Sequence, residues 1–136
     1  MEIIIFDTTR KLYKFLRETG ALEKLELFKN TPKELIPPDN VGYVAIDNNG
    51  IVLGAATLYE EEINVWFNEL FEITPESRGK GIGKLLYEFI KQDLEPEKIH
   101  GFCTNAKNKS FWEHLGQVCI DEETSEMLEI INKNRN

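Results

Sequence analysis

The sequence has few of the residues that mark secreted, metal-binding or membrane proteins. Its two cysteines, Cys103 and Cys119, and its two histidines form no metal-ligand spacing and no disulfide framework. We therefore expect reduced thiols in a cytoplasmic protein, without a metal. No apolar run approaches the roughly 20 residues that a membrane span needs, and the N-terminus carries no basic signal segment. The sequence thus predicts no membrane association.

Basic residues are also scarce relative to acidic ones. The chain has 16 Lys and Arg against 24 Asp and Glu, which gives a net charge of −8. A negative protein repels the phosphate backbone, so we expect no nucleic-acid partner. The same field mildly favours a cationic substrate such as an amine.

The chain is long enough for one domain and too short for two ordinary ones. It has 136 residues, of which 41% are hydrophobic, enough to form a core. We find no internal repeat. We therefore expect a single domain over residues 1–136, with the polar tail 132–136 frayed.

The hydrophobic pattern alternates between strand and helix periods, which predicts a mixed α/β domain. A capping residue at Asp7, Thr8 or Thr9 and the stop at Gly20 bound the first helix. Glu60–Glu62 is expected to lie between two strands. The expected strands are residues 2–6, 41–46, 51–59, 63–73, 99–104, 118–120 and 127–131, and further helical segments are expected around 22–28, after Thr31, and at 82–94 and 105–115.

A glycine-rich loop between the long strand and the long helix is the most informative feature. Alternating glycines at Gly79, Gly81 and Gly83 allow backbone N–H groups to converge on one point. The start of the following helix adds a partial positive charge, and nearby Lys and Arg side chains add full charges. These properties predict a phosphate or pyrophosphate ligand.

Two common phosphate-binding motifs do not fit this loop. A P-loop that ends at Gly83-Lys84 needs Gly at position 78 and Ser or Thr at 85, where the chain has Arg78 and Leu85. A dinucleotide fingerprint that begins at Gly79 needs Gly at position 84, which is Lys84.

The loop does match the pattern Arg/Gln-x-x-Gly-x-Gly/Ala, through Arg78, Gly81 and Gly83. Further along, Asn105 precedes Phe-Trp-Glu-His-Leu-Gly at 111–116. With both segments in this order, the chain resembles the GNAT superfamily of acyl-CoA-dependent N-acyltransferases. The resemblance implies a GNAT-like α/β (mixed α+β) fold, with a central, mostly antiparallel sheet of about seven strands flanked by helices. It also implies an N-acetyltransferase that uses acetyl-CoA to acetylate a primary amine on an unknown small molecule or protein.

The resemblance further implies where coenzyme A binds. Its pantetheine arm would follow the strand before the glycine loop, around Phe71, Glu72 and Ile73. Asn105 would lie near the pantetheine, although Asn is equally common as a helix cap. Trp112 would pack near the coenzyme. The pyrophosphate would bind the loop itself, that is Arg78, Gly79, Lys80, Gly81, Ile82, Gly83 and Lys84.

The catalytic groups are less determined than the coenzyme site. Glu69 and Glu72 are the candidates for a general base, because they lie on the strand that should border the acceptor; the alternative is that they are solvated strand residues. Trp112 stands where the family often has an acidic Tyr, and an indole N–H is not a usable acid. His100 fits a structural role better than a catalytic one.

Two further possibilities follow from these gaps. Without an evident acid or base, the chain could be a catalytically weak or inactive acyl-CoA-binding or sensor module. Because the last predicted hairpin is short, the acceptor site could be open, or a second subunit could complete it in a homodimer. The acceptor itself has no diagnostic motif.

Overall fold

The computed structural model describes residues 1–103 and 106–131. The tail 132–136, predicted to be frayed, lies outside the described residues. The helices and strands follow one another as β1 (Glu2–Phe6), α1 (Thr9–Glu18), η1 (Ala21–Lys24), α2 (Glu26–Asn30), η2 (Lys33–Leu35), β2 (Val41–Ile46), β3 (Val52–Glu62), β4 (Val65–Ile73), η3 (Pro75–Ser77), α3 (Ile82–Leu94), β5 (Lys98–Phe102), α4 (Ala106–His114), β6 (Val118–Asp121) and β7 (Glu126–Ile130).

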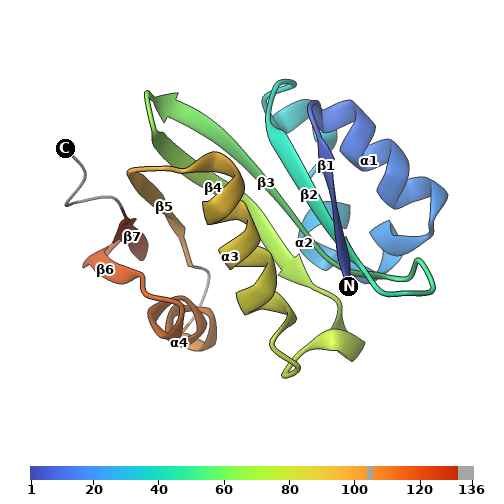
Figure 1. Cartoon of the computed structure of the whole chain (residues 1–136). Coiled ribbons are helices and arrows are strands. Elements are labelled where there is room, and N and C mark those ends of the chain that lie inside the picture. The colour runs from blue at the N-terminus through green and yellow to red at the C-terminus, as the bar shows by residue number, and fades with distance from the viewer. Residues whose placement is uncertain (104–105, 132–136) are drawn as a thin grey trace. The chain divides into compact units, whose positions relative to one another are not determined.

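The strands form a seven-stranded sheet in the order β1-β2-β3-β4-β5-β7-β6 (Figure 1). Strands β4 and β5 pair in parallel, while β1–β2, β2–β3, β5–β7 and β6–β7 pair antiparallel. The predicted mixed α/β fold with a mostly antiparallel sheet is therefore confirmed. None of the helices described is long and apolar enough to cross a membrane.

The contacts divide the chain into two compact units, which we describe separately. The first unit contains residues 1–59 and 69–93, and the second contains residues 60–68 and 94–136. Strands β3 and β4 each contribute residues to both units.

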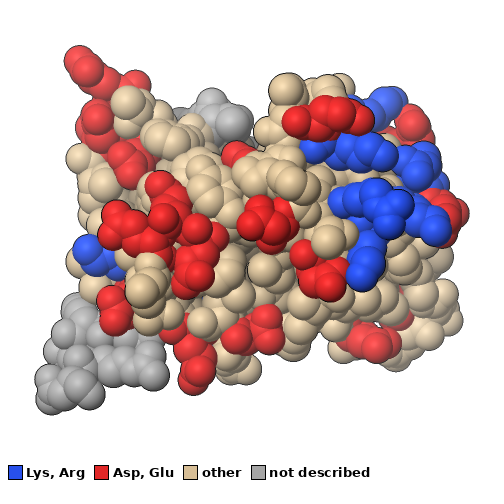
Figure 2. Space-filling view, turned by 90° about the horizontal axis from the view of Figure 1, so that it is seen from above, with Lys and Arg blue, Asp and Glu red and all other residues tan. Residues whose placement is uncertain are grey.

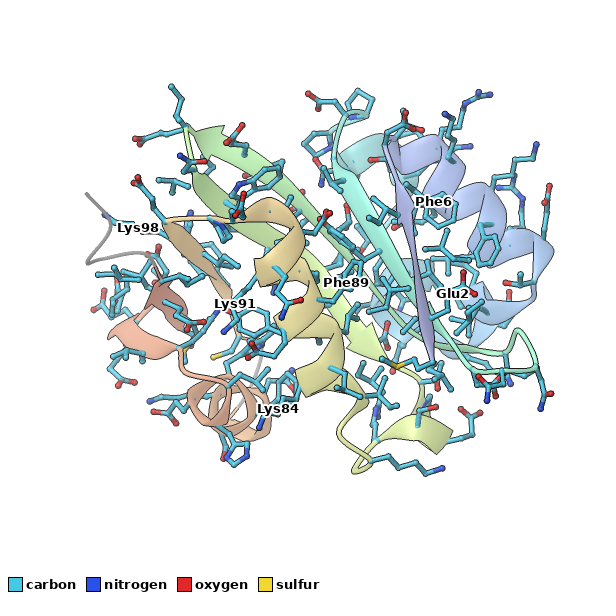
Figure 3. The ribbon with its side chains drawn as sticks, viewed as in Figure 1. Glu2, Phe6, Lys84, Phe89, Lys91 and Lys98 are labelled. Atoms are coloured by element: carbon cyan, nitrogen blue, oxygen red, sulfur yellow. The ribbon has the colours of Figure 1, made fainter. Side chains whose placement is uncertain are left out.

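In the first unit, helices cover both faces of the sheet. Val44 of β2 packs with Leu12 and Leu16 of α1 in a core from which water is excluded. The neighbouring Tyr43 points to the opposite face, because successive strand residues alternate. There its ring meets Phe89 of α3 at 6.1 Å between centroids, and its hydroxyl donates to Asp93. Figure 3 shows Phe89 on α3.

Helix α1 begins where a side chain can satisfy its first backbone donors. Thr8 has extended backbone angles, and its hydroxyl accepts from the N–H of Lys11 at 3.2 Å. This is the capping role expected of Ser, Thr, Asp or Asn at a helix start. The predicted cap is thereby resolved to Thr8. The helix is followed by Gly20, whose φ of +79° ends the turn.

The second unit places α4 beside the last hairpin. Met127 of β7 and Ile99 of β5 are buried, as are Trp112 and Leu115 in and after α4. Gly116 takes a φ of +109° directly after this helical segment, as its predicted position past the helix end requires.

Two predicted boundaries were wrong. Glu60–Glu62 does not lie between strands: it ends β3, and the chain turns at Ile63-Asn64 instead. Asn64 adopts a φ of +64°, which Asn tolerates better than most residues. The second helical segment is also broken, because Leu25 leaves the helical region with φ −110° and ψ 88°.

Candidate functional site

The glycine loop in the first unit has the backbone shape that its sequence predicts. Gly79 and Gly81 have φ values of +78° and +79°, in the left-handed region that favours glycine. A Cβ atom added to either would meet nothing within 4 Å, so the loop surface is open. Gly83 differs, because it is buried in the first turn of α3.

The start of α3 supplies donors for an anion. The first N–H groups of any α-helix lack intrahelical acceptors, and the first turn of α3 contains no acidic residue. Lys80 and Lys84 are exposed there, and neither pairs with a carboxylate among the residues described; Figure 3 shows Lys84 on the first turn. Backbone donors, the helix dipole and two cations thus converge on one open loop.

Arg78 is oriented differently from the two lysines. Its Nε donates to the carbonyl of Ile73 at 3.0 Å, and its guanidinium lies 3.8 Å from the carboxylate of Glu72. The side chain is still 57% exposed. Arg78 therefore folds back over the end of β4 rather than standing free in the loop.

Strand β4 leaves part of one edge without a strand partner. Among the described residues, β4 pairs with β5 from Val65 to Asn68 and not beyond. The backbone groups of Glu69 to Ile73 along that edge can therefore bind an extended ligand. Phe71 contributes a ring that packs edge-on against Tyr87 of α3, with 6.5 Å between centroids.

Glu69 and Glu72 have different surroundings, although both were candidates for the base. Glu72 is only 7% exposed and accepts from the N–H of Leu27 in α2 at 2.8 Å. Burial raises its pKa, while backbone N–H groups of α2 and the charge of Arg78 oppose that rise. The interpretation of Glu72 as a solvated strand residue was therefore wrong.

Glu69 is half-buried, and no hydrogen bond or ion pair to it is found within the described part of the chain. Burial raises the pKa of its carboxyl group. Its charge also acts on Tyr13, whose pKa rises to about 12 through burial and through the charges of Glu69 and Glu34. The Tyr13 hydroxyl donates to the carbonyl of Thr31 at 2.8 Å. Of the two carboxylates, Glu69 is thus the one that no hydrogen bond or ion pair holds within the described residues.

A groove lies in the first unit between α2 and the turn that leads to the glycine loop. Its volume is about 520 Å³. The lining carries charges of both signs, and Lys24 Nζ lies 3.9 Å from a Glu76 oxygen. The lining residues are Glu23, Lys24, Glu26, Lys29, Asn30, Pro75 and Glu76.

In the second unit, His100 is bracketed by two carboxylates. Its Nδ1 lies 3.0 Å from Glu126, its Nε2 contacts Glu61, and the ring of Phe67 packs edge-on against it. The two carboxylates lie at opposite nitrogens of the ring, so the three groups do not converge on one point. No group of three or more metal-ligating side chains is found within residues 1–103 and 106–131. The contacts of both ring nitrogens with carboxylates are what holds the His100 side chain in place.

Trp112, a predicted residue of the second signature, also lies in this unit. Trp112 is 8% exposed and packs edge-on against Phe111, so packing accounts for its side chain. Asn105 lies outside the described residues. The contact of Glu72 with Leu27 could not be predicted from the sequence, because the two residues are 45 positions apart along the chain.

Comparisons with known proteins agree with this arrangement. Residues 38–116, which include the glycine loop and the second signature, match the family model "Acetyltransferase (GNAT) domain". No curated protein sequence matches the chain.

Many solved structures share the fold. GCN5 from Tetrahymena has a TM-score of 0.75 at 13% identity, with 97% of each chain covered. A GNAT-family acetyltransferase from Staphylococcus aureus Mu50 has a TM-score of 0.68 at 16% identity, covering 95% of this chain and 99% of that one. PaiA N-acetyltransferase from Thermoplasma acidophilum, solved with coenzyme A, has a TM-score of 0.63 at 16% identity, covering 96% and 100%.

Proposed function

The chain belongs to the acetyltransferase (GNAT) domain family, and from that premise we propose that it is an N-acetyltransferase that moves the acetyl group of acetyl-CoA to a primary amine. The observation that carries the coenzyme assignment is the open glycine loop at the start of α3. Its left-handed glycines and the unpaired donors of the first helical turn suit a diphosphate. Lys80 and Lys84 add charge without an acidic neighbour in the first turn.

The proposed coenzyme site extends from the loop along β4. The pyrophosphate binds the backbone amides of residues 78–84, and the pantetheine arm follows the unpaired edge around Phe71, Glu72 and Ile73. Asn105 and Trp112 are proposed as coenzyme-binding residues on the family's second signature alone, not on a contact with the loop. Acetyl-CoA is a cosubstrate here, and the proposal includes no metal.

The proposed chemistry is direct attack of a neutral amine on the thioester. Glu69 takes the amine proton, because burial raises its pKa and no other group within the described residues holds its carboxylate. Backbone N–H groups stabilise the negative charge that develops on the carbonyl oxygen. The bond from carbon to sulfur then breaks and CoA leaves as a thiolate, an adequate leaving group because a thiol has an ordinary pKa near 8.5. The thiolate takes a proton from water, and Glu69 returns the amine proton to solvent.

One observation favours a second candidate function. Trp112 occupies the position where a Tyr acid is common, and it is buried by packing. An acyl-CoA-binding module that transfers nothing would need no acid there. A homodimer and a cytoplasmic location stay predictions.

Release of free CoA thiol from acetyl-CoA distinguishes the two candidates. The purified chain is mixed with acetyl-CoA and a panel of amines: alkylamines, polyamines, aminoglycosides, amino acids and peptide amino termini. An enzyme releases thiol with at least one amine faster than the same mixture without protein. Thiol release at the background rate with every amine, in protein that binds CoA, would support the sensor and contradict the transferase.

A further inference from the structure

Glu72 combines deep burial with an unusual set of neighbours. A buried carboxylate is costly unless hydrogen bonds hold it. Here one oxygen, Oε1, accepts from the N–H of Leu27 at 2.8 Å, and the N–H groups of Glu26 and Phe28 also favour the charged form. The side chain of Glu72 therefore reaches from β4 to the first turn of α2 and holds it there.

The second carboxylate oxygen faces the proposed coenzyme loop. Glu72 Oε2 lies 3.8 Å from a terminal nitrogen of Arg78, the residue that opens the loop. Arg78 is fixed from the other side, because its Nε donates to the carbonyl of Ile73 at 3.0 Å. The positive charge of Arg78 favours the ionised form of Glu72, and the backbone N–H of Glu26 in α2 favours it too.

We propose that Glu72 is a positioning residue that connects the coenzyme loop to α2 through Arg78. A diphosphate bound at the loop then changes the surroundings of Glu72 and, through it, the first turn of α2. The assignment of the ligand rests on the proposed function, whereas the connection itself does not. Glu72 then has no role in taking the proton of the amine.

The physical basis is competition for one guanidinium. Arg78 is 57% exposed, so its charge can also serve an anion at the loop. Arginine binds phosphate strongly through its forked donors. A diphosphate that draws Arg78 away leaves Glu72 without its cationic neighbour, while the bond to Leu27 remains.

The connection also affects the groove between α2 and the turn that leads to the glycine loop, because the two segments that Glu72 and Arg78 join form the walls of that groove. One wall is formed by η1 and α2, and the other by Pro75 and Glu76 just before Arg78. A change at Arg78 and Glu72 therefore acts on both walls. This gives the chain a route by which coenzyme binding prepares a neighbouring surface for a second ligand.

The test follows the backbone amide of Leu27 by NMR in the full chain, as a function of pH. The amide proton shift of Leu27 reports the ionisation of Glu72, since the two are hydrogen-bonded. We expect a transition at Leu27 with a midpoint above the ordinary value of 4.5, because burial raises the pKa of Glu72. Saturating CoA should move that midpoint to higher pH.

Variants separate the connection from other effects. In Arg78→Gln, the midpoint without CoA should already be higher, and CoA should add little to it. In Glu72→Gln, whose amide oxygen can still accept from Leu27, the transition should vanish while the fold is kept. Lys29→Gln removes a cation from α2 itself, yet Lys29 is paired with Glu23, so this control should behave as the parent chain does.

Each failure has a different meaning. An equal CoA-induced shift in the parent and in Arg78→Gln would overturn the relay through Arg78. A Leu27 amide insensitive to pH, or a midpoint unchanged by Arg78→Gln, would overturn the connection without any use of CoA. If the amides of residues 79–84 do not respond to CoA at all, the proposed function fails, and with it the assignment of the diphosphate.

Discussion

At the scale of single residues, the environment separates two similar carboxylates on β4. Glu72 is held by α2 and Arg78, while Glu69 is half-buried and unpaired within the described residues. Environments of this kind let two carboxylates on one strand take different roles. The difference leads to opposite expectations for the two residues.

Replacing Glu69 by Gln should remove the proposed base. We expect acetyl transfer at neutral pH to fall by about 10²- to 10⁴-fold. In the profile of rate against pH, the increase in rate around the pKa of Glu69 should also disappear. Initial rates of thiol release from pH 4 to 9 measure both effects, with Glu62→Gln, an exposed carboxylate at the end of β3, as the control. A Glu69→Gln variant with the parent profile would exclude Glu69 as the base.

The same substitution has a predictable sign for stability. Since burial raises the pKa of Glu69 in the folded chain, the native state binds more protons than the unfolded state just above pH 4.5. The parent chain therefore loses stability relative to Glu69→Gln as pH rises through that window. Urea unfolding at pH 4 and pH 7 checks this sign, and a larger relative loss at pH 4 would contradict it.

Gly54 of β3 is required for close packing against β4. A Cβ there would lie 2.6 Å from Ile73 Cδ1 and 2.9 Å from the carbonyl oxygen of Glu72. Because backbone cannot yield easily, Gly54→Ala should lower the free energy of unfolding by about 1–3 kcal/mol. Urea unfolding measures the loss. An unchanged midpoint would mean that β3 tolerates a wider separation from β4.

Single residues also show what the sequence could and could not predict. The left-handed glycines of the loop were predictable, because their effect on the backbone is local. The bond of Glu72 to Leu27, and the contacts of His100 with Glu61 and Glu126, join residues 26 to 45 positions apart. No local pattern encodes such pairs, so only the folded chain reveals them.

At the scale of elements, the boundaries of helices and strands could be predicted where the local sequence signals were strong. Helix α3 combines apolar residues at helical spacing with a glycine start and Pro96 beyond its end. The turn between β3 and β4 was misplaced, because three glutamates looked more like a turn than Ile63-Asn64 does. The first of them, Glu60, accepts from the N–H of Asn64 and so helps to fix the turn.

The N-terminal cap of α1 offers a direct test at this scale. Thr8→Ala removes the acceptor for the N–H of Lys11 and should lower the free energy of unfolding by about 1 kcal/mol. Thr8→Ser keeps a hydroxyl and should cost much less. Chemical denaturation of both variants decides the point, and equal losses would show that the hydroxyl does not cap the helix.

At the scale of the whole molecule, charge is distributed unevenly. The chain carries a net charge of −8, yet Lys and Arg gather over α1, as Figure 2 shows. Helix α1 itself contains the basic residues Arg10, Lys11, Lys14 and Arg17. The sum of charges alone therefore describes this surface poorly. In contrast, the family could be predicted from the whole chain, because the two spaced motifs and the order of strands and helices both indicated it.

Binding of the coenzyme should stabilise the whole chain by mass action. At 100 times the dissociation constant, CoA should add about 2.7 kcal/mol to the free energy of unfolding. For a chain of this length that corresponds to a rise in melting temperature of about 10 °C. Scanning calorimetry with and without CoA measures it. A melting temperature independent of CoA would contradict specific binding to the folded state.

The most direct test of the central claim is calorimetric titration of the parent chain and of Gly81→Glu with acetyl-CoA and CoA. Gly50→Glu is the matched control, because Gly50 has a φ of +80° and equally open surroundings in the β2–β3 turn. We predict micromolar binding to the parent and to Gly50→Glu, and a loss of at least about tenfold, or 1.4 kcal/mol, in Gly81→Glu. Equal binding by all three chains, or by none, would contradict the assignment of the glycine loop as the coenzyme site.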